Sequence, residues 1–166
     1  MSVAPEFLAR ALDAAQRAAD AAEAITRPRY RTQDFSVVTK ADATPVTEAD
    51  RDAEAAIKRV LREAFPDHAF YGEEEGREGD GDFLWLIDPI DGTKAFVRGY
   101  PMFSTQIALM LAGELVLGVS AAGEYGERAW AVRGGGAFLR SGDDSARRIR
   151  VSDVAEFGPP TAMSAG

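Results

Sequence analysis

Apolar residues near the start of the chain repeat with the period of a helix. They recur every three or four positions from Phe7 to Ile25, and most of them are alanine. Alanine has the highest helix propensity and leaves a thin face that suits close packing. The pattern therefore predicts a first helix, which we expect to end at Pro28 because proline interrupts helical hydrogen bonding.

A second helical pattern follows a short predicted strand at 34–40. Thr47 precedes this helix, and Asp50 stands three residues later in an arrangement typical of a capping box. The apolar positions have helical spacing, and Pro66 ends the pattern. The predicted buried stripe consists of Ala53, Ile57, Val60, Leu61 and Ala64.

After residue 66 the pattern changes to short apolar runs separated by polar and glycine-rich connections. These runs predict strands at 69–71, 83–87, 104–111, 114–120, 127–132, 136–139 and 147–151. Ala112 and Gly113 lie between two of the runs and indicate a hairpin. Two helices packed on a mostly antiparallel sheet predict an α+β fold.

The length of 166 residues suits one complete domain. We predict an α+β domain over 1–155 that binds metal and phosphate. Residues 156–166 are predicted to be a connector and the start of a truncated C-terminal α/β domain. Both a fragment and a natural truncation remain open.

Composition excludes several classes of protein. The absence of cysteine excludes disulfides, thiolate metal sites and cysteine nucleophiles, and a single histidine gives little support to zinc sites or histidine-dependent triads. The net charge of −8 argues against nucleic-acid binding. Charges recur every few residues near the N-terminus, so we expect no signal peptide, no membrane span and a cytoplasmic location.

Acidic residues gather beside turn residues in four segments, 47–50, 72–76, 80–82 and 88–93. The last segment directly follows a predicted strand, which places Asp88 and Asp91 at its C-terminal end. Pro89 restricts the backbone there, and Gly92 permits a tight turn. Thr93 can start a short helix whose free N–H groups favour an anion.

Paired carboxylates beside an anion-binding turn suit a site for metal and phosphate. Mg²⁺ takes oxygen ligands, often one or two carboxylates together with phosphate and water. Two such ions can activate a water and stabilise a leaving oxygen. Glu73, Asp88 and Asp91 can supply converging carboxylates, although the 88–92 segment alone is equally compatible with an ordinary strand–turn–helix connection.

Three ordered segments resemble the signature of the inositol monophosphatase family, a group of Mg²⁺-dependent, lithium-sensitive phosphomonoesterases. They are VTEAD (46–50), GEE (72–74) and WLIDPIDGTKAFVRGYP (85–101). The resemblance implies a sugar-phosphatase-like fold, two or three Mg²⁺ ions and direct attack of water on phosphorus without a phosphoenzyme. It also implies a small phosphorylated metabolite as substrate and a homodimer as one assembly.

The resemblance assigns the metal roles residue by residue. Glu73 binds the catalytic metal, and Glu74 lies close by and helps to organise metal and water. Asp88 bridges two metals, and the carbonyl of Ile90 completes the first metal site. Asp91 ligates the second metal.

The phosphate and water roles fall on neighbouring positions. By resemblance, the backbone amides of Gly92 and Thr93 hold the phosphate. The Thr93 hydroxyl, paired with Asp50, orients and deprotonates the attacking water. Lys40 matches a lysine of a mobile loop that approaches the metal site. From the residues alone, a helix cap is the favoured interpretation of Asp50, and beside the DGT segment a dual role is favoured.

Lys94 marks a branch of the family. Inositol-specific members commonly carry Thr after DGT, whereas members acting on histidinol phosphate or on 3′-phosphoadenosine 5′-phosphate often carry Lys. The residues after Lys94 are similar to the histidinol-phosphatase-like branch. The implied substrate is histidinol phosphate or a compound like inositol monophosphate, with 3′-phosphoadenosine 5′-phosphate as the alternative. A plain surface lysine is the other interpretation.

One departure from the family concerns a third metal-binding Asp that follows Trp in its C-terminal domain. Neither Trp85 nor Trp130 precedes Asp in this sequence. We therefore expect that domain to be missing, and a truncated, non-catalytic metal- or phosphate-binding module is the alternative to an enzyme. We interpret Glu75 and Glu78 as solvated loop acids and His68 as structural.

Overall fold

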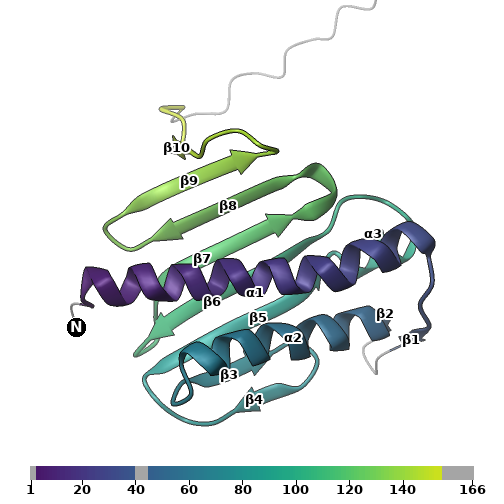
Figure 1. The fold of residues 1–166 in the computed structure, drawn as a ribbon, viewed down its shortest axis with the longest axis horizontal. Helices are drawn as coiled ribbons and strands as arrows, with labels where there is room; N and C mark the ends of the chain where they lie inside the picture. Colours follow the sequence, from purple (N-terminus) through teal and green to yellow (C-terminus); the bar gives the residue numbers. More distant parts are fainter. Residues whose placement is uncertain (1–2, 40–44, 155–166) are drawn as a thin grey trace, which may run out of the picture.

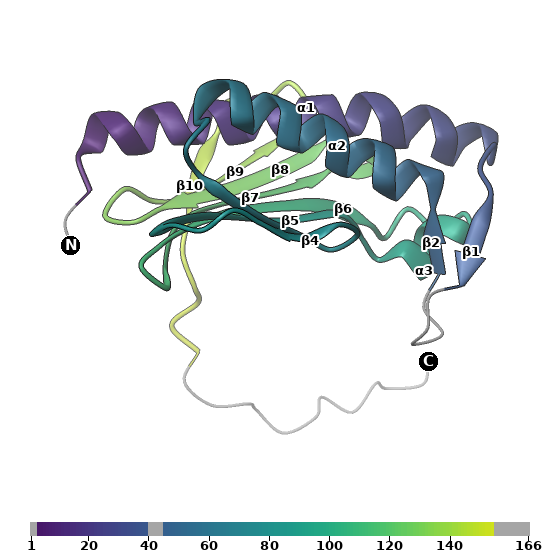
Figure 2. The ribbon, with the colours of Figure 1, turned by 90° about the horizontal axis from the view of Figure 1, so that it is seen from below.

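The computed structural model describes residues 3–39 and 45–154 of the chain (Figure 1). Two long helices, α1 (Pro5–Thr32) and α2 (Glu48–Ala64), pack against each other and against one face of a sheet. Helix α1 contacts strands β6 (Ser104–Leu111) and β7 (Glu114–Ala122), and α2 contacts β5 (Phe83–Asp91). Figure 2 shows both helices on the same side of the sheet.

The main sheet has eight strands in the order β10-β9-β8-β7-β6-β5-β3-β4. Every neighbouring pair is antiparallel except β3 and β5, which are parallel. The strands are β3 (Ala69–Gly72), β4 (Gly76–Glu78), β5 (Phe83–Asp91), β6 (Ser104–Leu111), β7 (Glu114–Ala122), β8 (Glu127–Val132), β9 (Gly136–Ser141) and β10 (Arg147–Ile149). The predicted α+β class is confirmed.

Smaller elements complete the described fold. Strands β1 (Val37–Thr39) and β2 (Pro45–Thr47) form a two-stranded antiparallel sheet before α2. Helix α3 (Thr93–Val97) follows β5, and a short 3₁₀ helix, η1 (Gly123–Tyr125), follows β7. Neither α1 nor α2 is apolar enough over a sufficient length to cross a membrane, and no other described helix is either.

Two hydrophobic clusters hold the layers together. The larger lies between the helices and the sheet, where the alanine face of α1 and Ile57 of α2 pack against strand residues such as Trp85 and Leu109. The smaller contains Ile90, Phe96 and other buried residues at one end of the sheet. Ile90 lies between Asp88 and Asp91 in the sequence. Its packing in the smaller cluster therefore fixes the segment that carries both aspartates.

The prediction that the first helix ends at Pro28 was wrong, because α1 continues through Pro28 to Thr32. The Tyr30 ring packs against Phe96 and Phe103, at centroid distances of 5.8 and 4.9 Å, and its hydroxyl donates to a backbone carbonyl. These tertiary contacts favour one more helical turn, which ends where Gln33 adopts a left-handed conformation.

Most predicted strands are present with changed ends. The hairpin at Ala112 and Gly113 is confirmed: these two residues join β6 to β7 and both have positive φ. The strand predicted at 83–87 is longer and runs to Asp91, whereas β2 and β4 were not predicted. The connector predicted at 156–166 lies outside the described residues.

Candidate metal and phosphate site

Strand β5 carries two aspartates, Asp88 and Asp91, in its C-terminal part. Its pairing with β6 shifts register between Asp88 and Asp91, which marks a bulge in the strand. The hydroxyl of Thr105 on β6 donates to the carbonyl of Pro89 at 2.9 Å. With Ile90 fully buried, this irregular segment is fixed from both sides while Asp91 remains exposed.

Gly92 makes the sharp turn from β5 into α3. Its φ of +97° belongs to the left-handed region, and a Cβ at this position would lie 2.7 Å from the carbonyl oxygen of Met102. Only glycine combines that backbone conformation with so close an approach. The turn places the amide of Thr93 at the first position of α3, directly after the carboxylates.

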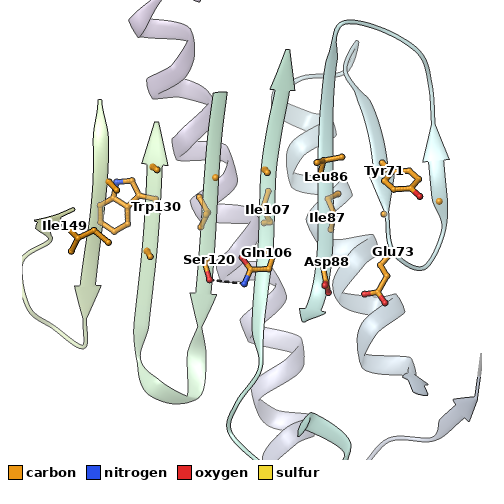
Figure 3. Close-up of a pocket in the computed structure, with 18 residues that line it drawn as sticks. Tyr71, Glu73, Leu86, Ile87, Asp88, Gln106, Ile107, Ser120, Trp130 and Ile149 are labelled. Carbon is orange, nitrogen blue, oxygen red and sulfur yellow. Dashed lines mark hydrogen bonds between the residues drawn. The ribbon is translucent and has the colours of Figure 1, made fainter. Parts of the chain in front are cut away.

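Three carboxylates gather at the carboxyl ends of β3 and β5. The Glu73 amide donates to the carbonyl of Ile87 at 3.1 Å, which holds the turn after β3 against β5. Figure 3 shows the Glu73 and Asp88 side chains at the same end of a groove. Burial, the neighbouring Glu73 carboxylate and the charge of Asp91 raise the pKa of Asp88 to about 7.

The donor set and its electrostatics fit a divalent cation. The Oδ1 atom of Asp88 is buried and accepts no hydrogen bond, so a polar atom there lacks a partner. A cation would satisfy that atom and would offset the mutual repulsion of the carboxylates. Among the described residues, no group of three or more Asp, Glu or His side chains is arranged so that it could hold a metal ion by itself. Mg²⁺ does not require one, because it commonly keeps several waters and uses one or two carboxylates with phosphate.

Asp50 lies at the start of α2 and links this helix to the turn after β5. Its Oδ2 accepts from the amide and the hydroxyl of Thr47, at 2.8 and 2.6 Å, and the Asp50 amide donates back to the Thr47 hydroxyl. The predicted capping box is therefore confirmed. Burial raises the pKa of Asp50, although its hydrogen bonds with Thr47 and Thr93 act in the opposite direction.

The hydroxyl of Thr93 lies between two acceptors. Its Oγ1 is 3.3 Å from Oδ1 of Asp50 and 3.0 Å from the carbonyl oxygen of Ile90. A hydroxyl has one proton to donate, so these oxygens compete for it. The structure thus brings together Asp50, Thr93 and the Ile90 carbonyl, three groups separated by up to 43 positions in the chain.

A groove of about 740 Å³ runs along the sheet from the carboxylates (Figure 3). On this face Asp88 pairs across the strands with Gln106, and Gln106 pairs with Ser120. The side-chain Nε2 of Gln106 donates to Ser120 Oγ at 3.0 Å and to Ser104 Oγ at 2.7 Å. Beyond these polar groups, the groove is mostly apolar.

Helix α2 contains two buried charged residues that the sequence patterns did not predict. Glu54 is fully buried, and Lys58 is 3% exposed. The Lys58 ammonium contacts the carboxylates of Glu54, Glu75 and Glu78 at 2.9, 2.8 and 2.5 Å. Burial acts to lower the pKa of Lys58, but these three carboxylates outweigh it and raise the pKa above its usual value.

The interpretation of Glu75 and Glu78 as solvated loop acids was incomplete. Their side chains are 51% and 39% exposed, but both pair with Lys58, and Glu78 lies in strand β4. The signal in the sequence was the spacing of Asp50, Glu54 and Lys58, which recur every four residues and so share one face of α2. A polar face beside the apolar stripe indicates that these charged side chains have partners elsewhere in the fold, which here include Glu75 and Glu78.

The remaining predicted positions are placed as follows. Glu74 is half-buried in the turn after β3, and its amide donates to Glu54. Lys94 is exposed in the first turn of α3. Lys40 lies outside the described residues. His68 is structural, as predicted: its Nδ1 accepts from the Trp85 indole N–H at 3.1 Å.

Comparison with known proteins gives consistent matches. The sequence model of the inositol monophosphatase family matches residues 8–163. A histidinol-phosphatase from Streptomyces coelicolor is 48% identical over 140 residues, which cover 82% of this chain and 53% of that protein. A histidinol-phosphatase from Mycobacterium tuberculosis is 43% identical over 142 residues, covering 84% of this chain and 54% of that protein.

Solved structures agree with these sequence matches. The crystal structure of the extragenic suppressor protein SuhB from Bartonella henselae is similar with a TM-score of 0.78 and 35% identity. The match covers 87% of this chain and 54% of that chain. The chain therefore spans about half the length of the relatives it matches.

Proposed function

The chain belongs to the inositol monophosphatase family, and from this premise we propose that it carries the metal- and phosphate-binding part of a Mg²⁺-dependent phosphomonoesterase. One observation carries the proposal. The buried Oδ1 of Asp88 has no hydrogen-bond partner and lies among carboxylates, directly before the turn at Gly92 and Thr93. A carboxylate in this setting needs a cation, and the turn beside it offers amides to a phosphate.

Four residues would hold the metal ions. Glu73 and Asp91 would contribute exposed carboxylates, Asp88 its half-buried carboxylate, and Ile90 its backbone carbonyl. Two or three bound Mg²⁺ ions would supply a more acidic water and charge neutralisation for the leaving oxygen. Glu74, next to Glu73 in the same turn, would help to arrange this water.

The chain's own residues would bind the phosphate and move the proton. The amides of Gly92 and Thr93 would hold phosphate oxygens. The Thr93 hydroxyl would orient the attacking water and pass its proton towards Asp50, whose Oδ1 lies 3.3 Å away. A raised pKa makes Asp50 a better proton acceptor than an ordinary aspartate. The water oxygen would then form a bond to phosphorus while the phosphorus–oxygen bond to the alcohol breaks, and the leaving oxygen would take a proton from solvent water. No phosphoenzyme would form.

We propose histidinol phosphate as the preferred substrate, with inositol monophosphates second. Two relatives at 48% and 43% identity are named histidinol-phosphatases. Lys94, which the resemblance associates with this branch, is exposed beside the phosphate-binding turn.

The test measures Mg²⁺ binding by calorimetry and Mg²⁺-dependent phosphate release from histidinol phosphate, inositol 1-phosphate and 3′-phosphoadenosine 5′-phosphate. We expect release that favours histidinol phosphate and is abolished by Asp88→Asn. The exposed Asp82→Asn is the matched control and should leave release unchanged. Binding of Mg²⁺ without release from any compound would favour the non-catalytic module, and absence of Mg²⁺ binding would overturn the site.

A further inference from the structure

Helix α2 contains a buried ion pair next to the candidate site. Glu54 is fully buried and Lys58 is 3% exposed. Charged side chains at such depth are costly unless they are paired and hydrogen-bonded. Their partners therefore indicate what the pair does for the fold.

Both oxygens of Glu54 accept hydrogen bonds from the turn that carries Glu73. This turn joins β3 to β4 and consists of the three residues 73–75 between the paired Gly72 and Gly76. The Glu74 amide donates to Oε2 of Glu54 at 2.8 Å, and the Glu75 amide donates to Oε1 at 3.2 Å. A single carboxylate thus holds two successive amides of the turn.

The third amide of the turn is held from the other side. The Glu73 N–H donates to the carbonyl of Ile87, the residue that precedes Asp88 on β5. The three successive N–H groups of the turn are therefore all tied, one to β5 and two to α2. This arrangement fixes the backbone of Glu73 relative to the strand that carries Asp88.

Gly72 makes room for this contact. A Cβ on Gly72 would lie 1.8 Å from Oε1 of Glu54, far inside any tolerated contact. Gly72 has no positive φ, so backbone conformation does not explain the glycine. Its lack of a side chain is instead explained by the Glu54 carboxylate, which comes up against the strand at this position.

Lys58 holds the Glu54 carboxylate in place. Its ammonium contacts Glu54 at 2.9 Å and also reaches Glu75 of the turn and Glu78 of β4. Glu78 in turn accepts from Arg62 at 2.7 Å. We call Glu54, Lys58, Glu75 and Glu78 the Lys58 cage.

We propose that Glu54, held by Lys58, is a positioning residue that fixes the turn 73–75 so that the Glu73 carboxylate meets Asp88 at the separation a metal ion needs. This inference rests on the proposed function. Glu54 itself would touch neither metal nor substrate. Its effect would pass through the backbone of the turn, as it does for the residues that orient metal ligands in other sites.

A plain electrostatic effect is the main alternative, and charge-changing variants separate the two. Glu54→Gln removes one acceptor from the turn and one negative charge. Lys58→Met removes one positive charge and releases the Glu54 carboxylate. If only the electrostatic potential at the metal site mattered, Lys58→Met would tighten Mg²⁺ binding because it removes a positive charge. The positioning role instead predicts that both variants weaken Mg²⁺ binding.

The double variant Glu54→Gln/Lys58→Met gives the sharpest test, because its net charge equals that of the original chain. It also keeps the proposal testable if Lys58→Met alone fails to fold, since no buried charge is left unpaired. We expect its Mg²⁺ affinity, measured by calorimetry on the 166-residue chain, to fall about tenfold. The exposed neighbours Glu63→Gln and Arg59→Met are matched controls and should bind Mg²⁺ normally.

Amide hydrogen exchange gives a readout that needs no metal. Exchange at Glu74 and Glu75 should be about tenfold faster in Glu54→Gln than in the Glu63→Gln control. Faster exchange with unchanged Mg²⁺ affinity in the double variant would overturn the positioning role while leaving the proposed function intact. Failure of the original chain to bind Mg²⁺ would overturn the proposed function, and this inference with it.

Discussion

Two groups of acidic side chains meet at the turn 73–75, which contributes Glu75 to one group and Glu73 to the other, and the charges of the two groups are compensated differently. In the Lys58 cage, one ammonium contacts three carboxylates within 2.9 Å. In the other group Asp88 has carboxylates, Glu73 and Asp91, as its charged neighbours, and these raise its pKa. Its buried Oδ1 accepts no hydrogen bond.

The difference shows which acids the fold uses for its own architecture. Glu54 is deeper than Asp88, yet every oxygen of Glu54 has a partner. Asp88 is only half-buried and lacks a partner on one oxygen. Burial alone therefore does not distinguish a structural acid from a functional one. The uncompensated group, Asp88, is the one to which the proposed function assigns a ligand.

The largest expected effect is a loss of stability when the cation of the cage is removed. Lys58→Met leaves Glu54 buried without its charge partner, which should lower the free energy of unfolding by about 3–5 kcal/mol. Urea denaturation followed by tryptophan fluorescence measures this change. The exposed Arg59→Met should stay within about 0.5 kcal/mol of the original chain. A loss below about 1 kcal/mol for Lys58→Met would mean that the cage does not stabilise the fold.

The second largest effect should have the opposite sign for stability. Asp88→Asn removes the repulsion at the site, so the metal-free chain should unfold with a free energy that is about 1 kcal/mol higher. The same variant should lose at least about a hundredfold in Mg²⁺ affinity, or about 2.7 kcal/mol. Urea denaturation in chelator and calorimetry with Mg²⁺ measure the two changes. A destabilised Asp88→Asn would place Asp88 with the structural acids and erase the contrast with the cage.

A third titratable group, the half-buried His68, sharpens the comparison because its environment favours the neutral form. Its ring stacks on Phe65 and Phe83, at centroid distances of 4.6 and 4.7 Å, and its Nδ1 accepts from Trp85. Burial and, to a smaller extent, Arg10 lower the pKa of His68. The unfolded chain therefore takes up the proton first, and stability should fall as the pH drops below about 6.5.

The expected loss from protonation of His68 is about 1 kcal/mol, the worth of the hydrogen bond from Trp85. His68 is the only histidine, so NMR titration of its ring gives the pKa directly, and urea denaturation at pH 8 and pH 5.5 gives the stability. His68→Asn should remove the part of the pH dependence that lies near the pKa of histidine. A ring that titrates at or above its usual pKa would contradict this assignment.

Local patterns were enough to predict much of the fold. The capping box at Thr47 and Asp50, the hairpin at Ala112 and Gly113 and the strand at 127–132 each depend on neighbouring residues. The end of α1 was mispredicted because it depends on Tyr30 meeting aromatic rings that lie far along the chain. Local rules for proline cannot include such contacts.

The site divides in the same way. The acids of the turn and of β5 were visible as motifs, because glycine and proline beside carboxylates already indicate a shaped turn. Glu54 and Lys58 were not, since charged residues within a helix are exposed by default. The amides that make Glu54 useful belong to residues 20 and 21 positions away. Only the packing of α2 against the turn shows that the polar face of this helix binds the backbone amides of Glu74 and Glu75.

The smallest expected effect tests whether the contact of Lys58 with Glu75 contributes as much to stability as its contact with Glu54. The Glu75 side chain is 51% exposed, whereas that of Glu54 is fully buried, so the two contacts of Lys58 differ mainly in solvent screening. Glu75→Gln should lower the free energy of unfolding by less than about 1 kcal/mol, and salt should reduce the difference further. The backbone N–H of residue 75 can still donate to Glu54, so the Mg²⁺ affinity should stay within about twofold of the original value. Urea denaturation at low and high salt and calorimetry measure both. A loss as large as that of Lys58→Met would make the exposed contact, rather than Glu54, the anchor of the turn.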